Sequence, residues 1–175
     1  MIRNSVAFKS ILMVGFVIFA TVVVGIAQTT TSDSEPLLKD VAREELQEII
    51  NSYEDEKAVL INVWATWCAP CIEEFPHIVE LQREYQDEVQ VIFISADFPD
   101  NRERAIKFLK EQEVDWMTYF KTGKDQPFIE ALSENWSGAL PFTKILDKDG
   151  HVIASWEQGA EYEKFKTNIK KALNN

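Results

Sequence analysis

The two cysteines of this chain, Cys68 and Cys71, are separated by only two residues, in the segment Cys68-Ala69-Pro70-Cys71. An apolar run typical of a strand, 58–64, precedes them, and a segment with helical periodicity follows. A Cys-x-x-Cys pair at such a junction places its first sulfur over the N-terminus of a helix. There, unpaired backbone N–H groups and the helix dipole stabilise a thiolate. The pair is therefore predicted to be a reactive, reversible dithiol.

Two further interpretations of the pair remain open from the residues alone. A structural zinc site needs four ligands, and the other nitrogen or sulfur candidates are His77 and His151, with no second pair of cysteines in the sequence. A purely structural disulfide would close a very short loop, which constrains the unfolded chain only slightly. We therefore favour redox chemistry and predict neither a bound metal nor a cofactor.

Residues 1–27 are predicted to be a signal peptide or an N-terminal membrane anchor. Arg3 and Lys9 are their only charged residues, and residues 11–27 are almost entirely apolar. This apolar stretch ends in Gly-Ile-Ala at 25–27, which places small residues where a signal peptidase cleaves. As a helix it would rise about 25 Å, close to the minimum for crossing a bilayer. Cleavage and retention both remain open, and either gives an exported protein, periplasmic or anchored and facing the periplasm or exterior.

A polar linker, 28–35, leads into a single predicted domain, 36–175. About 140 residues is a typical size for one domain with one core. The formal net charge of −11 becomes −13 without Arg3 and Lys9. Such acidity disfavours nucleic acid and anionic lipid surfaces as partners. A lone dithiol in an oxidising compartment becomes oxidised, so a reducing function would require an electron donor.

Apolar periodicity predicts an α/β domain built on a central mixed sheet. The predicted helices are 36–52, 70–85, 100–113 with Asp100 as its cap, 125–135 and 161–173, and the predicted strands are 58–64, 89–95, 116–120, 141–146 and 151–156. An Asp- and Gly-containing turn at 147–150 joins the last two strands and is a strong hairpin signal. These elements predict helices on both faces of the sheet, with the dithiol at the carboxyl end of a central strand.

The sequence Trp-Ala-Thr-Trp-Cys-Ala-Pro-Cys at residues 64–71 resembles the active-site motif of the thioredoxin superfamily. More narrowly, residues 45–173 look like the exported TlpA/ResA-type thiol–disulfide oxidoreductases. Asn62 stands where cytosolic thioredoxins usually carry a buried Asp, and Glu74 follows the second cysteine by three residues, as in the ResA-like members. The resemblance implies a thioredoxin-like fold with an extra helix–strand insertion after Ser95.

The resemblance implies catalytic roles for Cys68, Cys71 and Glu74. Cys68, the more exposed cysteine, would attack a client disulfide as a thiolate, and Cys71 would then resolve the mixed disulfide. Pro70, which suits the first helical turn, would fix the spacing of the sulfurs. Glu74 would act as a general acid or base for Cys71. A second interpretation remains open, in which Glu73 and Glu74 are both solvated carboxylates stabilised by the helix dipole.

A substrate-binding surface at Trp67, Leu140 and Pro141 is also implied by the resemblance. Trp67 would cover one side of the sulfur pair, and its other interpretation is a half-exposed aromatic residue without a role. Pro141 would be a cis-proline that leaves the neighbouring backbone, including that of Leu140, open to pair with an extended substrate. Phe142 and Lys144 depart from the family, which commonly has Thr and an apolar residue at these positions, and this bears on substrate preference.

We therefore predict an exported thiol–disulfide oxidoreductase whose partners are client proteins with cysteines or disulfides. The resemblance favours the reductant direction, as does the absence of a positive charge between the sulfurs at Ala69-Pro70. That direction would require a membrane electron donor, and the maturation of cytochrome c is one task such proteins perform. The alternatives are an oxidase or isomerase, a copper-carrying protein and a non-catalytic binding domain. Copper carriers of this fold pair their cysteines with a distal histidine, and none lies near Pro141 in the sequence.

Overall fold

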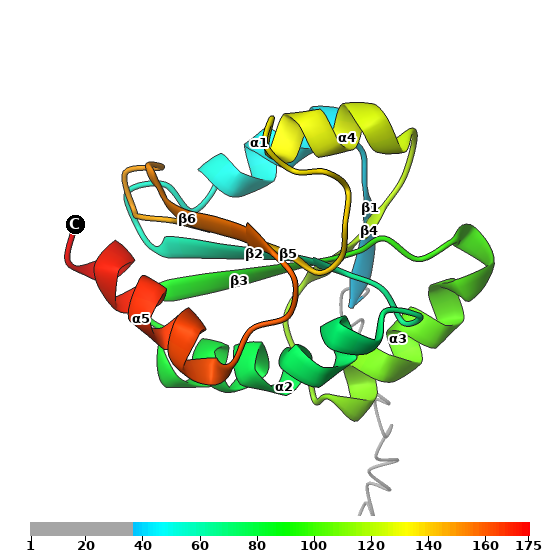
Figure 1. Cartoon of the computed structure of the whole chain (residues 1–175), viewed down its shortest axis with the longest axis horizontal. Helices are drawn as coiled ribbons and strands as arrows, with labels where there is room; N and C mark the ends of the chain where they lie inside the picture. Colours follow the sequence, from blue (N-terminus) through cyan, green and yellow to red (C-terminus); the bar gives the residue numbers. More distant parts are fainter. Residues whose placement is uncertain (1–36) are drawn as a thin grey trace, which may run out of the picture. The chain divides into compact units, whose positions relative to one another are not determined.

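A six-stranded mixed sheet forms the centre of residues 37–175, the part of the chain that this computed structural model describes (Figure 1). Its strand order is β1-β4-β3-β2-β5-β6. Neighbours from β1 to β2 run parallel, whereas β5 runs antiparallel to β2 and β6 runs antiparallel to β5. The strands are β1 (Leu38–Val41), β2 (Ala58–Trp64), β3 (Val89–Ser95), β4 (Thr118–Lys121), β5 (Phe142–Leu146) and β6 (Val152–Glu157).

Helices cover both faces of this sheet, as the sequence predicts (Figure 1). One face carries α1 (Arg43–Asn51) and α4 (Asp125–Leu132), and the other carries α2 (Ala69–Glu84), α3 (Arg102–Glu111) and α5 (Tyr162–Leu173). Each layer of helices buries its own apolar cluster against the sheet. All seven residues of β2 are buried, because this strand is central and covered on both sides.

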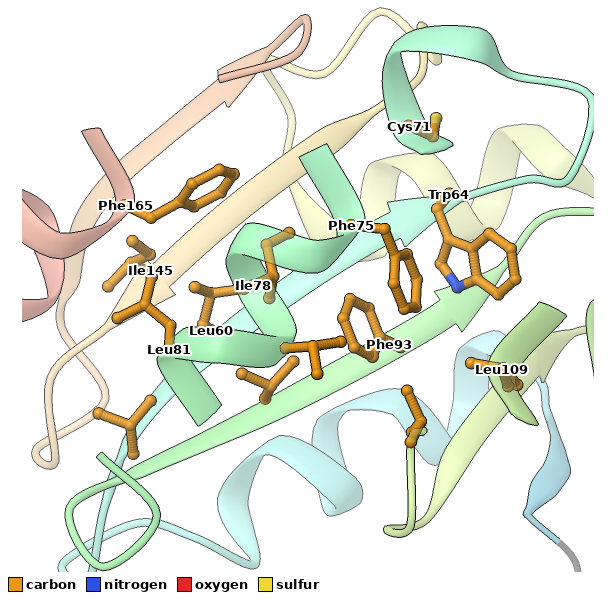
Figure 2. Packing of buried hydrophobic residues seen from close by; sticks show 14 of the residues in the cluster. Leu60, Trp64, Cys71, Phe75, Ile78, Leu81, Phe93, Leu109, Ile145 and Phe165 are labelled. Atoms are coloured by element: carbon orange, nitrogen blue, oxygen red, sulfur yellow. The ribbon is translucent and has the colours of Figure 1, made fainter. Parts of the chain in front are cut away.

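Aromatic packing holds the first turns of α2 against the sheet (Figure 2). The ring centroid of Phe75 lies 4.0 Å from that of Phe93 on β3 and 4.9 Å from that of Trp64 at the end of β2. All three side chains are fully buried, and burial of a Phe side chain contributes about 1.5–3 kcal/mol. Cys71 lies on the same helix, one turn before Phe75, so this packing fixes the second cysteine relative to β2.

The predicted helix at 36–52 is wrong in its first half. Residues 38–41 form β1, which pairs in parallel with β4, and the helix begins only at Arg43. Leu38 and Val41 are both buried, but they belong to the apolar clusters on opposite faces of the sheet. Two residues three positions apart share a face of a helix but lie on opposite faces of a strand, so their spacing suggested a helix. The pairing with β4 decides the outcome.

The predicted helix cap at Asp100 is also wrong. The segment begins as a 3₁₀ turn, η1 (Pro99–Asn101), and α3 follows with Asn101 at its N-cap position and no side-chain cap hydrogen bond. Pro99 starts the turn because its fixed φ suits the first helical position, and Asp100 therefore lies inside the turn. The remaining predicted helices and strands are present, and the bounds of 58–64 and 89–95 agree with β2 and β3.

The predicted signal peptide or anchor at 1–27, the linker at 28–35 and residue 36 lie outside the described residues. In residues 37–175, no helix combines the length and the apolar character needed to span a bilayer.

Candidate active site

Cys68 and Cys71 form a disulfide at the N-terminus of α2, with an S–S distance of 2.03 Å and a Cα–Cα distance of 5.3 Å. Cys68 is the N-cap residue of this helix, and its Sγ accepts a hydrogen bond from the backbone N–H of Cys71 at 3.3 Å. Pro70 occupies the first turn. Cys68 is 6% exposed and Cys71 is fully buried. The predicted position of the first sulfur over a helix start is confirmed, and Cys68 is the more accessible cysteine.

The loop before Cys68 is held by Asp97, which the sequence analysis did not single out. Its buried carboxylate accepts hydrogen bonds from the backbone N–H of Thr66 at 3.0 and 3.1 Å, from the Thr66 hydroxyl at 2.6 Å and from the Ser95 hydroxyl at 2.9 Å. Arg104 donates to the Thr66 carbonyl at 3.3 Å. Asp97 lies just beyond the end of β3, and the carboxyl ends of neighbouring parallel strands meet at one edge of the sheet. The position of Asp97 just after a predicted strand was therefore the signal in the sequence that could have identified it as a residue of this site.

Glu74 lies inside the fold with only 2% of its surface exposed. Its Oε1 accepts a hydrogen bond from Asn62 Nδ2 at 2.8 Å, and its Oε2 accepts one from the backbone N–H of Ala160 at 2.9 Å. Burial raises the pKa of this carboxyl from 4.5 to about 7, against the opposing effects of these two hydrogen bonds and of the Lys164 charge. The interpretation of Glu74 as a solvated carboxylate is therefore wrong, whereas Glu73 is exposed.

Asn62 connects Glu74 on α2 to the neighbouring strand β5. Its Nδ2 also donates to the hydroxyl of Thr143 on β5 at 3.1 Å, and both residues are buried. Within residues 37–175, the Asn62 Oδ1 atom has no hydrogen-bond partner. Sequence reasoning selected Asn62 and Glu74 separately, and the structure brings them together. Sequence reasoning missed Thr143 and Ala160, which contact Asn62 and Glu74 from β5 and from the loop before α5.

The proline loop has the geometry that the resemblance implied, because the Leu140–Pro141 peptide bond is cis. Trp136 supports this loop: its indole N–H donates to the Ala139 carbonyl at 2.8 Å, and its ring stacks on Phe142 with centroids 4.6 Å apart. Phe142, which departs from the family pattern, is thus a core residue of β5. Lys144, the other departure, donates from Nζ to the Leu132 carbonyl at 2.8 Å, and burial lowers the pKa of its amine.

A cleft of about 870 Å³ lies beside the disulfide-bearing loop. Trp67 and Leu140 both line it, so the structure joins two of the three predicted substrate-binding residues, while Pro141 is not among the lining residues. Trp67 is 52% exposed and stacks on Phe98, which is 66% exposed, with ring centroids 6.3 Å apart. Phe120, Ile129 and Trp136 add further apolar surface. The charged residues that line the cleft are Asp40, Asp97, Arg102, Lys121 and Asp125.

The charged groups of the cleft are largely paired with each other. Arg102 forms an ion pair with Asp40 and donates to the Leu38 carbonyl, and Lys121 pairs with Asp125 at 2.5 Å. The cleft therefore presents mainly aromatic and aliphatic surface. The chain's two histidines are not among its lining residues.

Comparison with known proteins agrees with this geometry. Residues 30–173 match the family model described as Redoxin. A protein named thiol-disulfide oxidoreductase ResA from Oceanobacillus iheyensis is 30% identical over 164 residues, which are 86% of this chain and 80% of that protein.

Other relatives align over less of their length. A ResA from Bacillus cereus is 32% identical over 99 residues, or 55% of this chain, so the chain spans about half (53%) of that relative. A solved structure described as a DsbF homologue from Corynebacterium diphtheriae superposes with a TM-score of 0.61 and 24% sequence identity, covering 70% of this chain and 75% of that one. This last likeness shows a shared thioredoxin-like fold.

Proposed function

We propose that this chain, which belongs to the Redoxin family and is a ResA-like member of the thioredoxin superfamily, is a thiol–disulfide oxidoreductase acting on protein cysteines. The observation that carries the proposal is the Cys68–Cys71 disulfide at the N-cap of α2. A sulfur at this position accepts a backbone N–H bond and faces the positive end of the helix dipole, and both favour its thiolate form after reduction.

The exchange reaction needs only the two sulfurs and a client disulfide. In the reductant direction, the Cys68 thiolate attacks one client sulfur, the client S–S bond breaks, and a mixed disulfide forms while the other client sulfur leaves and takes up a proton. Cys71 then loses its proton and attacks the Cys68 sulfur, which releases the second client thiol. Two electrons pass from the dithiol to the client, and the chain ends with the disulfide of this structure.

Glu74 is suited to accept the proton that Cys71 must lose. It lies three residues after Cys71 on α2, a spacing that places both on one side of the helix. Its pKa of about 7 is close to neutral pH, so near neutrality this group can both accept and release a proton readily. We therefore assign Glu74 as the general base of resolution and as the general acid of the reverse step.

The aromatic cleft supports binding of a client segment beside the disulfide. Trp67 and Phe98 expose large apolar side chains, and exposed aromatic surface next to a cavity is typical of a protein-binding site. Because the charged groups of the cleft pair with each other, we expect an apolar client side chain near the reacting cysteine. Trp67 and Leu140 would contact that segment, and Pro141 would orient the loop.

The finer function we propose is that of an exported reductant with a membrane electron donor, with cytochrome c maturation as one candidate task. It is supported by the apolar segment at 11–27 and by the ResA relatives. Its test is the reduction potential of the Cys68–Cys71 couple, measured against glutathione. A reductant is expected to have a potential clearly below about −180 mV, the value of disulfide isomerases, whereas a potential at or above it would favour an oxidase or isomerase.

The test of the core proposal is capture of mixed disulfides. Cys71→Ser leaves Cys68 able to attack but removes the sulfur that resolves the adduct, so client proteins are expected to stay bound to Cys68 until a reductant is added. The matched control, Cys68→Ser, is expected to capture none. Equal capture by the two variants, or insulin reduction that survives in Cys71→Ser, would contradict the proposal that this chain is a thiol–disulfide oxidoreductase.

A further inference from the structure

Both carboxylate oxygens of Glu74 face nitrogen donors. Asn62 Nδ2 donates to Oε1 at 2.8 Å, and the backbone N–H of Ala160 donates to Oε2 at 2.9 Å. This arrangement fits the ionised carboxylate, which only accepts hydrogen bonds. In residues 37–175 the structure shows no third partner for this carboxyl group. A proton on Glu74 therefore finds a buried acceptor only if one of the two donors is replaced.

Only one of these two donors can become an acceptor. A backbone N–H, such as that of Ala160, has no acceptor atom to offer in its place. The Asn62 side chain does, because a half-turn of its amide exchanges Nδ2 for Oδ1. The Oδ1 atom has no partner among the described residues, so the turn breaks no hydrogen bond that this oxygen makes.

The second partner of Asn62 tolerates the same exchange. Thr143 accepts from Nδ2 at 3.1 Å, and a hydroxyl both donates and accepts. After inversion, Oδ1 would accept from the Thr143 hydroxyl and from the protonated Glu74. In either orientation one end of the amide has two partners and the other end has none.

We propose that Asn62 is a positioning residue whose side-chain amide inverts when Glu74 takes up a proton and returns when the proton leaves. The inference rests on the proposed function for the source of that proton, the thiol of Cys71. The proton passes from the Cys71 sulfur to Glu74, and Asn62 then holds the neutral carboxyl by accepting its O–H. The Glu74 pKa of about 7 is consistent with both states being populated near neutrality.

The groups that face Glu74 from neighbouring elements are few. β2 contributes Asn62, β5 contributes Thr143 through Asn62, and the segment before α5 contributes the Ala160 N–H. Among residues 37–175, the one charge that acts on its pKa is that of Lys164 on α5. In the oxidised protein Cys68 and Cys71 are bonded to each other and carry no titrating proton. The inversion can therefore be followed there without interference from the thiols.

The experiment is nuclear magnetic resonance of the oxidised full chain across about pH 5 to pH 9. We expect the Glu74 carboxyl carbon and the Asn62 side-chain amide to titrate with one midpoint. The nuclear Overhauser contacts from the Asn62 amide protons to the Glu74 methylene and the Thr143 side chain should be present at high pH and lost at low pH. Unchanged contacts while Glu74 titrates, or a Glu74 carboxyl that does not titrate in this range, would overturn the proposal.

Glu74→Gln mimics the protonated Glu74 side chain at every pH, because its amide is neutral and carries N–H donors. The Gln oxygen must face the Ala160 N–H, so its amino group faces Asn62 and requires Oδ1 there. The Asn62 amide of this variant is expected to be independent of pH and to match the wild-type protein at low pH. Asn62 contacts like those of the wild-type protein at high pH would contradict the inversion. Capture by Cys71→Ser does not depend on this result, so the two proposals fail separately.

A second pair of variants tests the role of the Thr143 hydroxyl as a hydrogen-bond partner of Asn62. Thr143→Val leaves an Nδ2 hydrogen unsatisfied in the ionised state, whereas in the protonated state Oδ1 keeps its partner on Glu74. We therefore expect Thr143→Val to raise the pKa of Glu74 and Thr143→Ser to leave it in place, with the carboxyl carbon shift as the measurement. Equal pKa values in the two variants would contradict the proposed role of the hydroxyl.

Discussion

Two buried carboxylates, Asp97 and Glu74, support the segments that carry the Cys68–Cys71 pair, and they are hydrogen-bonded in different ways. Asp97 accepts four hydrogen bonds, all from Thr66 and Ser95 at the ends of β2 and β3. Glu74 accepts two, from Asn62 and from the backbone of Ala160. The first group ties together two loops at one edge of the sheet. The second ties α2 to β2 and to the segment before α5.

This difference separates a fixing role from a proton-carrying role. Asp97 satisfies both the backbone and the hydroxyl of Thr66, two residues before the attacking cysteine, so its loss should loosen the loop that carries Cys68. Glu74 has its pKa raised to about 7 by burial, so its loss should change how the protein responds to pH. The comparison therefore predicts that the two carboxylates affect different measurements.

Asp97→Ala is expected to produce the largest effect, a loss of about 4 kcal/mol in the free energy of unfolding of the oxidised protein. The Thr66 N–H and the hydroxyls of Thr66 and Ser95 would lose a buried acceptor. Denaturant unfolding measures this loss. Asp97→Asn, which keeps the shape and one acceptor oxygen, is the matched control and should cost about half as much. A loss below about 1 kcal/mol in the Ala variant would show that water replaces the carboxylate. It would contradict the role of Asp97 in fixing the loop before Cys68.

Glu74→Gln is expected to change the pH dependence of stability. Below pH 4.5 the carboxyl is neutral in both the folded and the unfolded chain. As pH rises from 4.5 to about 7, the unfolded chain ionises first, so the folded state loses stability, up to about 3 kcal/mol. The variant lacks this loss. The difference in unfolding free energy between variant and wild-type protein should therefore grow across this window and level off above it. A constant difference would contradict the raised pKa.

Thr66→Val should have an intermediate effect, about 1.5 kcal/mol, because it removes the hydroxyl bond to Asp97 at 2.6 Å but keeps the backbone bonds. Thr66→Ser is the matched control and should be closer to wild-type stability. The pH midpoint of client exchange should stay the same in both variants, since Glu74 is untouched. A shifted midpoint would mean that the two carboxylates are coupled.

Lys164→Gln should have the smallest effect. The Lys164 charge lowers the pKa of Glu74, so its removal should raise that pKa slightly. Lys164 is exposed, and the shift should therefore shrink further at high salt. The carboxyl carbon shift of Glu74 measures it, and Lys171→Gln on the same helix serves as the control. A shift of equal size in both variants would indicate a general charge effect and not a contact across the Glu74 site.

Sequence periodicity predicts the central part of the fold well. The strands 58–64 and 89–95 coincide with β2 and β3, because each is a continuous apolar run that needs no partner to be recognised. The edge strand β1 was predicted as helix, because four residues carry too little pattern and their pairing partner, β4, lies 80 residues further along the chain. Asp97 was missed for a similar reason, since its role depends on Thr66, 31 residues before it.

The sequence by itself determined the redox pair, its place between a strand and a helix, and the proline that precedes β5. These depend on local order: the spacing of two cysteines, an apolar run and a helix start. Only the tertiary structure decided that Glu74 is buried and what holds it. Its donors come from residues 12 and 86 positions away, and the burial that raises its pKa is a property of the packed surroundings and not of any segment alone.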